Sequence, residues 1–180
     1  NANPEMIVIT AGHESALMML NFLLDKGEFA MENPAYPKVY KSLEMYGRKV
    51  IPINLYEYGI DMEQLEKSDV DIVYVTPSHQ YPTGIVMSAG RRHELLQWAI
   101  KDSSRYIIED DYDSEFRYRG KPIPALQGID TSEKVIYIGT FSKSISPGLR
   151  MSYMVLPHIL MTKFMEKFSF GSNTVSATDQ

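Results

Sequence analysis

The sequence KVIYIGTFSKSISPGLRMSYMVL, residues 134–156, places a lysine between two runs of strand-forming residues. The run at 134–140 is apolar at nearly every position, which predicts a buried strand, and a second strand is predicted at 151–156. Lys143 therefore follows the carboxyl end of a strand. Open α/β sheets bind their ligands at this end of their strands.

The residue types around Lys143 suit a site that binds a phosphate and an aldehyde. A lysine amine that is partly shielded from water can form a Schiff base with an aldehyde. The hydroxyls of Thr140 and Ser142 suit a phosphate dianion, as does the planar guanidinium of Arg150, seven residues after the lysine. On spacing alone, an ordinary polar loop with one solvated lysine is the alternative.

The remaining chain alternates short apolar runs with segments of helical period. Further strands are predicted at residues 6–10, 29–32, 49–53, 70–76 and 105–110. Helices are predicted from Ala16 to a stop at Gly27, over 37–46, from the Asp61 cap to 65, from the Ser88 cap to about 101, and over 157–168. This order predicts an α/β fold of three layers (αβα) with a mostly parallel central sheet. The longest irregular stretch is expected at 115–133.

Length and composition limit the classes of protein that remain. The 180 residues favour one domain, and 18 Lys and Arg against 23 Asp and Glu give a net charge of −5, the wrong sign for binding nucleic acid directly. With no cysteine there is no disulfide or thiolate metal site, and without a membrane span or signal peptide the expected location is the cytoplasm. Because the chain opens at Asn1 without Met, we expect it to be part of a longer protein.

A second candidate cluster is IIEDDYDSEFRY, residues 107–118, which also begins in a predicted strand. Its carboxylates are compatible with a metal site, a solvated acidic turn, or a carboxylate facing a cationic ring nitrogen. The metal site is the weaker interpretation, because no second cluster with ligand spacing accompanies it.

A third candidate is TAGHESAL, residues 10–17, where a strand turns through Gly12 into a helix. The free N–H groups and the helix dipole make this turn an anion site in principle, although every strand-to-helix turn shares those features. Tyr36 and Tyr81 follow strands in turns that contain proline, so both rings can face the same cleft. Packing is the more common role for such aromatic residues.

In combination, the strings TPSHQYPTG, EDDYDSEFRYRGKPIPALQ and YIGTFSKSISPGLRMSYMVLP resemble a known family over nearly the whole chain. They are similar to the large domain of fold-type I, pyridoxal-phosphate-dependent aminotransferases of class I/II. The resemblance is strongest to the aminotransferase-like domain of the MocR/GabR branch of GntR-type transcriptional regulators. It implies that residues 1–180 are a large domain that binds pyridoxal 5'-phosphate, and that a DNA-binding domain before it and a small domain after it belong to the longer protein.

The resemblance also assigns a role to each candidate residue. Lys143 would carry the cofactor as an internal aldimine, Asp110 would face the pyridine nitrogen, and Tyr112 would hydrogen-bond the phenolic oxygen. The Tyr36 ring would stack on the cofactor. The phosphate would bind the residues of the turn and its neighbours, Gly12, His13, Glu14, Thr140, Ser142 and Arg150.

Two positions depart from the usual aminotransferase pattern and match the regulator branch. Tyr81 stands where typical members have an asparagine before Pro-Thr-Gly, and Asp113 stands where they have the tyrosine that follows the ring-nitrogen aspartate. The roles of His79, Tyr81 and Tyr112 therefore follow less directly from the resemblance than the role of Lys143.

Two functions follow from the resemblance. The first is a regulator's effector domain that senses an amine or amino acid by transaldimination, dimerises, contacts no membrane, and reaches DNA through an upstream domain. The second is the large domain of a free-standing aminotransferase that transfers an amino group to a 2-oxo acid. A nucleotide-binding domain without covalent chemistry ranks third, because neither a dinucleotide fingerprint nor a P-loop is present.

Overall fold

The computed structural model of the chain describes residues 3–24, 27–113, 123–141, 150–169 and 175. The chain folds around one mixed sheet. The strands, in their order across the sheet, are β1 (Ile7–Thr10), β8 (Ser152–Val155), β7 (Val135–Thr140), β6 (Tyr106–Asp111), β5 (Ile72–Val75), β2 (Phe29–Asn33), β3 (Val50–Tyr56) and β4 (Gly59–Ile60). The run β7-β6-β5-β2-β3 is parallel, whereas β8 is antiparallel to both of its neighbours and β4 is antiparallel to β3. The prediction of a mostly parallel sheet is confirmed.

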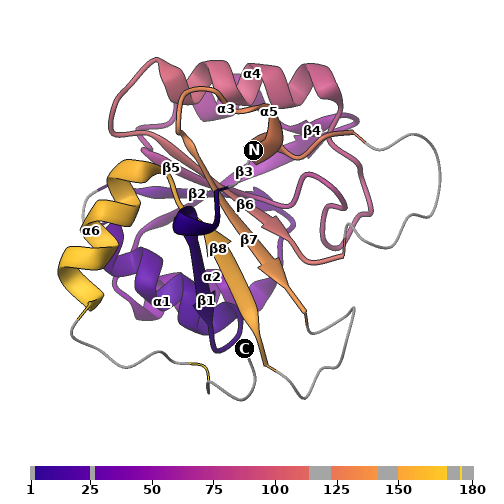
Figure 1. The fold of residues 1–180 in the computed structure, drawn as a ribbon. Helices are drawn as coiled ribbons and strands as arrows, with labels where there is room; N and C mark the ends of the chain where they lie inside the picture. Colours follow the sequence, from indigo (N-terminus) through magenta and orange to yellow (C-terminus); the bar gives the residue numbers. More distant parts are fainter. Residues whose placement is uncertain (1–2, 25–26, 114–122, 142–149, 170–174, 176–180) are drawn as a thin grey trace.

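Helices cover both faces of this sheet, as Figure 1 shows. On one face lie α1 (His13–Leu23), α2 (Pro37–Met45) and α6 (His158–Phe168); on the other lie α3 (Met62–Lys67), α4 (Ala89–Ile100) and α5 (Leu126–Ile129). A short 3-10 helix, η1 (Pro4–Met6), precedes β1. The three-layer αβα prediction is confirmed.

The central strands are apolar at successive positions because they contribute to two cores. In β6, Ile108 packs in the core with Leu17 and Leu20 of α1, while Ile107 packs on the opposite face with Trp98 of α4. Successive side chains of a strand point to opposite faces, so a strand covered by helices on both sides has no solvent-facing position to fill with polar residues.

The expected irregular stretch at 115–133 was wrong at its carboxyl-terminal end, where α5 forms. Glu109 of β6 is fully buried and accepts hydrogen bonds from the backbone N–H groups of Leu126 and Gln127, both at 2.9 Å. Its carboxylate thus supplies the cap that the local sequence of α5 lacks. Residues 115–122 lie outside the described part of the chain.

The sheet brings several strand ends to one edge. The carboxyl ends of β1, β2, β5, β6 and β7 lie there together with the amino end of β8, because β8 runs in the opposite direction. Ser152 of β8 pairs with both Thr10 and Thr140. The residues that directly follow or precede these ends therefore surround one region of space. In the described ranges, no helix is long and apolar enough to cross a membrane.

A close contact between β7 and β8 gives a test of this arrangement. Gly139 pairs with Tyr153, and a Cβ at position 139 would lie 2.4 Å from the Cζ atom of that tyrosine. The Tyr153 ring itself packs against the ring of Phe141, with the ring centroids 5.4 Å apart. We expect Gly139→Ala to lower the free energy of unfolding by about 1–3 kcal/mol, because the ring must move out of a packed position.

Urea denaturation followed by circular dichroism would measure this change. The control is Gly128→Ala in α5, where the added Cβ would meet no described atom within 4 Å apart from its chain neighbours and its own helix backbone. Equal stabilities of the two variants would contradict the packing of Tyr153 over β7.

Candidate functional site

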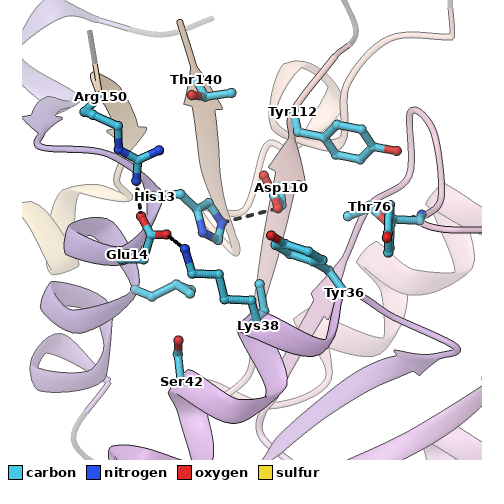
Figure 2. A pocket seen from close by; sticks show the side chains of 13 residues that line it. His13, Glu14, Tyr36, Lys38, Ser42, Thr76, Asp110, Tyr112, Thr140 and Arg150 are labelled. Atoms are coloured by element: carbon cyan, nitrogen blue, oxygen red, sulfur yellow. Dashed lines mark hydrogen bonds and ion pairs between the residues drawn. The ribbon is translucent and has the colours of Figure 1, made fainter. Parts of the chain in front are cut away.

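A cavity of about 370 Å³ opens at the edge of the sheet where these strand ends meet. Figure 2 shows its walls. They come from the amino end of α1, from α2 and the turn before it, and from the ends of β5, β6 and β7. The lining residues are His13, Glu14, Leu17, Tyr36, Lys38, Val39, Ser42, Thr76, Tyr81, Asp110, Tyr112, Thr140 and Arg150.

The amino end of α1 forms one wall of the cavity. Gly12 is its N-cap, with a φ of 82°, and among the described residues no side chain caps this helix end. The N–H groups of a first helical turn have no intrahelical partner, and the helix dipole adds partial positive charge there. A Cβ on Gly12 would lie 3.0 Å from Nη2 of Arg150, so glycine allows the guanidinium to approach the turn closely.

Two cations converge on one carboxylate beside this helix end. Arg150 donates from Nη2 to Glu14 at 2.6 Å, and Lys38 pairs with the other oxygen of the same carboxylate. The hydrogen bond from Lys38 lowers the pKa of Glu14 to about 2, although partial burial opposes the shift. Glu14 is therefore anionic at neutral pH, and its negative charge offsets one of the two positive charges in this part of the cavity.

Asp110 lies at the end of β6, where its carboxylate meets two aromatic side chains. Its Oδ2 atom accepts a hydrogen bond from the hydroxyl of Tyr74 and lies 3.3 Å from Nε2 of His13. The desolvation of His13 alone would lower its pKa, but the negative charge and hydrogen bond of Asp110 outweigh that effect, and the pKa is raised.

Tyr36 and Tyr81 form an aromatic pair at the mouth of the cavity. Their rings meet edge to face with centroids 5.2 Å apart. The amide of Gln80 connects the turns that carry them, since Nε2 donates to the carbonyls of Pro34 at 2.8 Å and Tyr81 at 2.6 Å. Gln80 thus holds both aromatic side chains in position.

A buried carboxylate, Glu32, lies directly behind this pair of turns. Its Oε2 accepts hydrogen bonds from the backbone N–H of Thr76 at 3.1 Å and from the Thr76 hydroxyl at 2.9 Å. Burial raises the pKa of Glu32 to about 7, against the opposing effect of these hydrogen bonds. Glu32 fixes Thr76, which lines the cavity at the end of β5.

Tyr112 lies on the far side of Asp110, and Figure 2 shows its ring at the cavity wall. Its hydroxyl donates to the carbonyl oxygen of His79 at 2.7 Å, and the two rings stack with centroids 6.3 Å apart. The His79 ring in turn contacts Asp113 at 2.8 Å through Nδ1. Asp113, which replaces the usual tyrosine, is therefore a buried partner of His79 and does not line the cavity.

The described carboxylates of the acidic cluster at 107–118 contact different partners. Glu109 caps α5, Asp110 faces the cavity, Asp111 accepts from the Tyr137 hydroxyl at 2.8 Å, and Asp113 contacts His79. Alternation along β6 separates neighbouring carboxylates to opposite faces. Among the residues described, no three His, Asp or Glu side chains are grouped so as to hold a metal ion.

The structure brings most of the predicted site residues together. The predicted residues that line the cavity are His13, Glu14, Tyr36, Tyr81, Asp110, Tyr112, Thr140 and Arg150. Gly12 shapes the turn beside it, and His79 lies behind Tyr112. Ser142 and Lys143 lie outside the described residues, so their placement stays a prediction, as do the roles of the others.

Sequence reasoning missed several lining residues, notably Lys38, Ser42 and Thr76. A signal for two of them was present: Lys38 and Ser42 follow Tyr36 by two and six residues on a helix that begins at the same turn. Thr76 directly follows β5, which is another strand ending at this edge. Tyr74, which contacts Asp110 from within β5, had no signal beyond its place in an apolar run.

Comparison with known proteins agrees with this geometry. The family model for class I and II aminotransferases matches residues 1–177. The chain belongs to this family.

The similar curated proteins include both regulators and enzymes. The chain is 42% identical over 181 residues to the uncharacterised HTH-type transcriptional regulator YdeL of Bacillus subtilis, covering 100% of this chain and 39% of the regulator. It is 39% identical over 163 residues to the probable rhizopine catabolism regulatory protein MocR of Rhizobium meliloti, covering 89% of this chain and 33% of that protein. It thus spans about two fifths or less of the length of these curated relatives.

Among solved structures, the kynurenine aminotransferase of Pyrococcus horikoshii, crystallised with PMP, superimposes with a TM-score of 0.83 at 31% identity. The match covers 93% of this chain and 45% of the enzyme. The fold is that of the fold-type I aminotransferases, as the sequence predicted.

The raised pKa of Glu32 predicts a pH-dependent stability. The unfolded chain releases this proton near pH 4.5 while the folded protein retains it to about pH 7, so the free energy of unfolding should fall as pH rises between these values. Glu32→Gln removes this contribution. Between pH 4.5 and pH 8, the free energy of unfolding of this variant should fall by about 1–3 kcal/mol less than that of the wild type.

Urea unfolding at a series of pH values would measure the slope. Part of the slope should remain, because burial also raises the pKa of Glu109 to about 7. The exposed variant Glu57→Gln should keep the full wild-type slope. An unchanged slope in Glu32→Gln would show that Glu32 is ionised in the folded protein at low pH.

Proposed function

We propose that this chain is the pyridoxal-phosphate-binding, aminotransferase-like effector domain of a GntR/MocR-type transcriptional regulator that senses an amine or amino acid. The observation that carries the cofactor-binding part of the proposal is the composition of the cavity. It combines a carboxylate at a strand end, Asp110, with an aromatic ring, Tyr36, and with a helix amino terminus that Arg150 approaches.

The described residues fit the cofactor at each of its ends. The uncapped turn at Gly12, His13 and Glu14 offers backbone N–H groups to a phosphate, and Arg150 and the Thr140 hydroxyl lie at the same cavity. A side chain at position 12 would fill the space between this turn and Arg150. Asp110 offers a carboxylate to a protonated ring nitrogen, because its contacts with the described residues Tyr74 and His13 are made through Oδ2.

Bound pyridoxal phosphate would supply an aldehyde for a lysine amine and a ring that accepts electrons when a bond to the substrate Cα breaks. The protein's own residues would bind and orient it. Lys143 and Ser142 carry their assignments from the sequence: Lys143 would be the amine that holds the aldehyde, and Ser142 would donate a hydrogen bond to the phosphate. Tyr112 would contact the phenolic oxygen, with Tyr81 and His79 beside it.

A bound phosphate would share the cations that now pair with Glu14. Arg150 and Lys38 now pair with that carboxylate, so the guanidinium must exchange Glu14 for the phosphate or contact both. Arg is suited to this role, since its planar fork presents several donors.

The regulator assignment rests on the relatives. Those with 35–42% identity include HTH-type regulators, among them the pyridoxine biosynthesis regulator PdxR of Corynebacterium glutamicum at 36%. DNA would be bound by another domain of the longer protein, consistent with the net charge of −5 here. We further propose a cytoplasmic homodimer in which the effector shifts the protein between two conformations.

An aminotransferase is the second candidate. The chain is 31% identical over 169 residues to aromatic-amino-acid aminotransferase 1 of Thermococcus litoralis. Both functions would use the same cofactor site, the same lysine and a substrate that carries an amine. They differ in whether the amino group is then transferred to a 2-oxo acid in repeated turnover.

Replacement of Lys143 tests cofactor attachment. The full-length protein loaded with pyridoxal phosphate should show a visible absorbance band that borohydride abolishes, and Lys143→Ala should not form that band. Lys67→Ala is the control, because Lys67 lies on α3 at the opposite face and pairs with Glu63. A wild-type protein that remains colourless with added cofactor would refute the proposal.

Assays of the full-length protein separate regulator from enzyme. We expect an amine or amino acid to change the visible spectrum and the affinity for operator DNA, without sustained turnover of donor and 2-oxo acid. Turnover at rates of about 1 per second or faster, typical of enzymes, would favour the aminotransferase.

A further inference from the structure

We infer that His13 and Tyr74 are positioning residues that hold Asp110 by one carboxylate oxygen and leave the other oxygen for the ligand. The inference rests on the proposed function, in which Asp110 faces the protonated ring nitrogen of the cofactor. It assigns to His13 a side-chain role beyond its place in the phosphate turn, and it adds Tyr74, which does not line the cavity.

Three separate elements bring these groups together. His13 is the first residue of α1, Tyr74 lies within β5, and Asp110 lies at the end of β6, next to β5 in the sheet. The Tyr74 hydroxyl donates to Oδ2 of Asp110. The Nε2 atom of His13 lies 3.3 Å from the same oxygen and 3.2 Å from the Tyr74 hydroxyl. The contact thus forms a closed triangle of polar atoms.

The other carboxylate oxygen of Asp110, Oδ1, differs from Oδ2 in its hydrogen bonds. Among the described residues, none donates a hydrogen bond to it, although the Asp110 side chain is only 12% exposed. The cavity includes Asp110 in its wall, and Figure 2 shows the carboxylate between His13 and Tyr36. A carboxylate held on one oxygen by two groups cannot turn freely, so the direction of its other oxygen is fixed.

Burial and nearby charges act on the protonation of both partners. Tyr74 is 3% exposed, and desolvation together with the charge of Asp110 raises its pKa well above the usual value, so the hydroxyl stays protonated. The imidazole of His13 also faces Glu14, which favours its protonated form, and Lys38, which opposes it. The carboxylate of Glu32 adds to the negative charge around Tyr74.

Because Oδ2 accepts from Tyr74 and lies next to His13, Oδ1 is the oxygen that would accept a hydrogen bond from a ring N–H. A carboxylate held in that position would favour the proton on the ring nitrogen, where it is needed if the ring is to accept electrons. His13 also connects this carboxylate to the turn at the amino end of α1. One residue would therefore take part in both proposed sites, the one for the ring nitrogen and the one for the phosphate.

Conservative variants of the full-length protein test this inference. Tyr74→Phe removes only the hydroxyl, and His13→Gln replaces the ring with an amide. Tyr137→Phe is the matched control: its hydroxyl donates to Asp111 at 2.8 Å, on the neighbouring strand, and Tyr137 does not line the cavity. The readouts are the Kd of pyridoxal phosphate from equilibrium dialysis and the protonation of its ring nitrogen, followed by 15N NMR of labelled cofactor over pH.

We expect Tyr74→Phe and His13→Gln each to raise this Kd about three- to tenfold, the cost of one lost hydrogen bond. Each should also change the pH at which the bound ring nitrogen loses its proton, whereas Tyr137→Phe should change neither quantity. A merely structural role would lower Tm and leave the ring protonation as in the wild type.

Two negative outcomes are distinguishable. A wild-type protein that binds no pyridoxal phosphate would overturn the proposed function and this inference with it. A wild type that binds the cofactor, with Kd and ring protonation unchanged in folded Tyr74→Phe, would overturn this inference alone. Should Tyr74→Phe fail to fold, unchanged values in His13→Gln would have the same meaning, and altered values would support the role of His13.

Discussion

The parallel pairing of β6 with β5 and β7 is the constraint on which the cavity depends. It places the ends of three strands at one edge, and with them Thr76, Asp110 and Thr140. The reversed direction of β8 then returns Arg150 to the same edge, next to the turn that leads into α1. Residues separated by more than 130 positions meet because the sheet order β1-β8-β7 brings both ends of the described chain to adjacent strands.

Sequence reasoning was most successful where a residue directly follows a strand or precedes a helix. The ends of apolar runs located Asp110 and Thr140, and the glycine turn located His13 and Glu14, because these positions depend on local pattern and on one general property of α/β sheets. The fold class followed from the same alternation. The family resemblance contributed the roles, which local pattern cannot supply.

The parts that were missed depend on contacts across the fold. Tyr74 reads as one more apolar strand residue, and only the adjacency of β5 and β6 shows that its hydroxyl meets Asp110. The helix α5 is four residues long and lacks its own side-chain cap, so its start depends on Glu109, 17 positions earlier. Propensity within a segment says nothing about a cap supplied by a distant strand.

The ion pairs of Glu14 have a consequence for how an anion would be taken up. Because Arg150 and Lys38 already share this carboxylate, one of their two positive charges is offset before an anion arrives. Dissolved salt screens the internal pair and the new pair alike. Anion uptake at this site should therefore depend on ionic strength less than at a site where both cations are unpaired, although the remaining positive charge keeps part of that dependence.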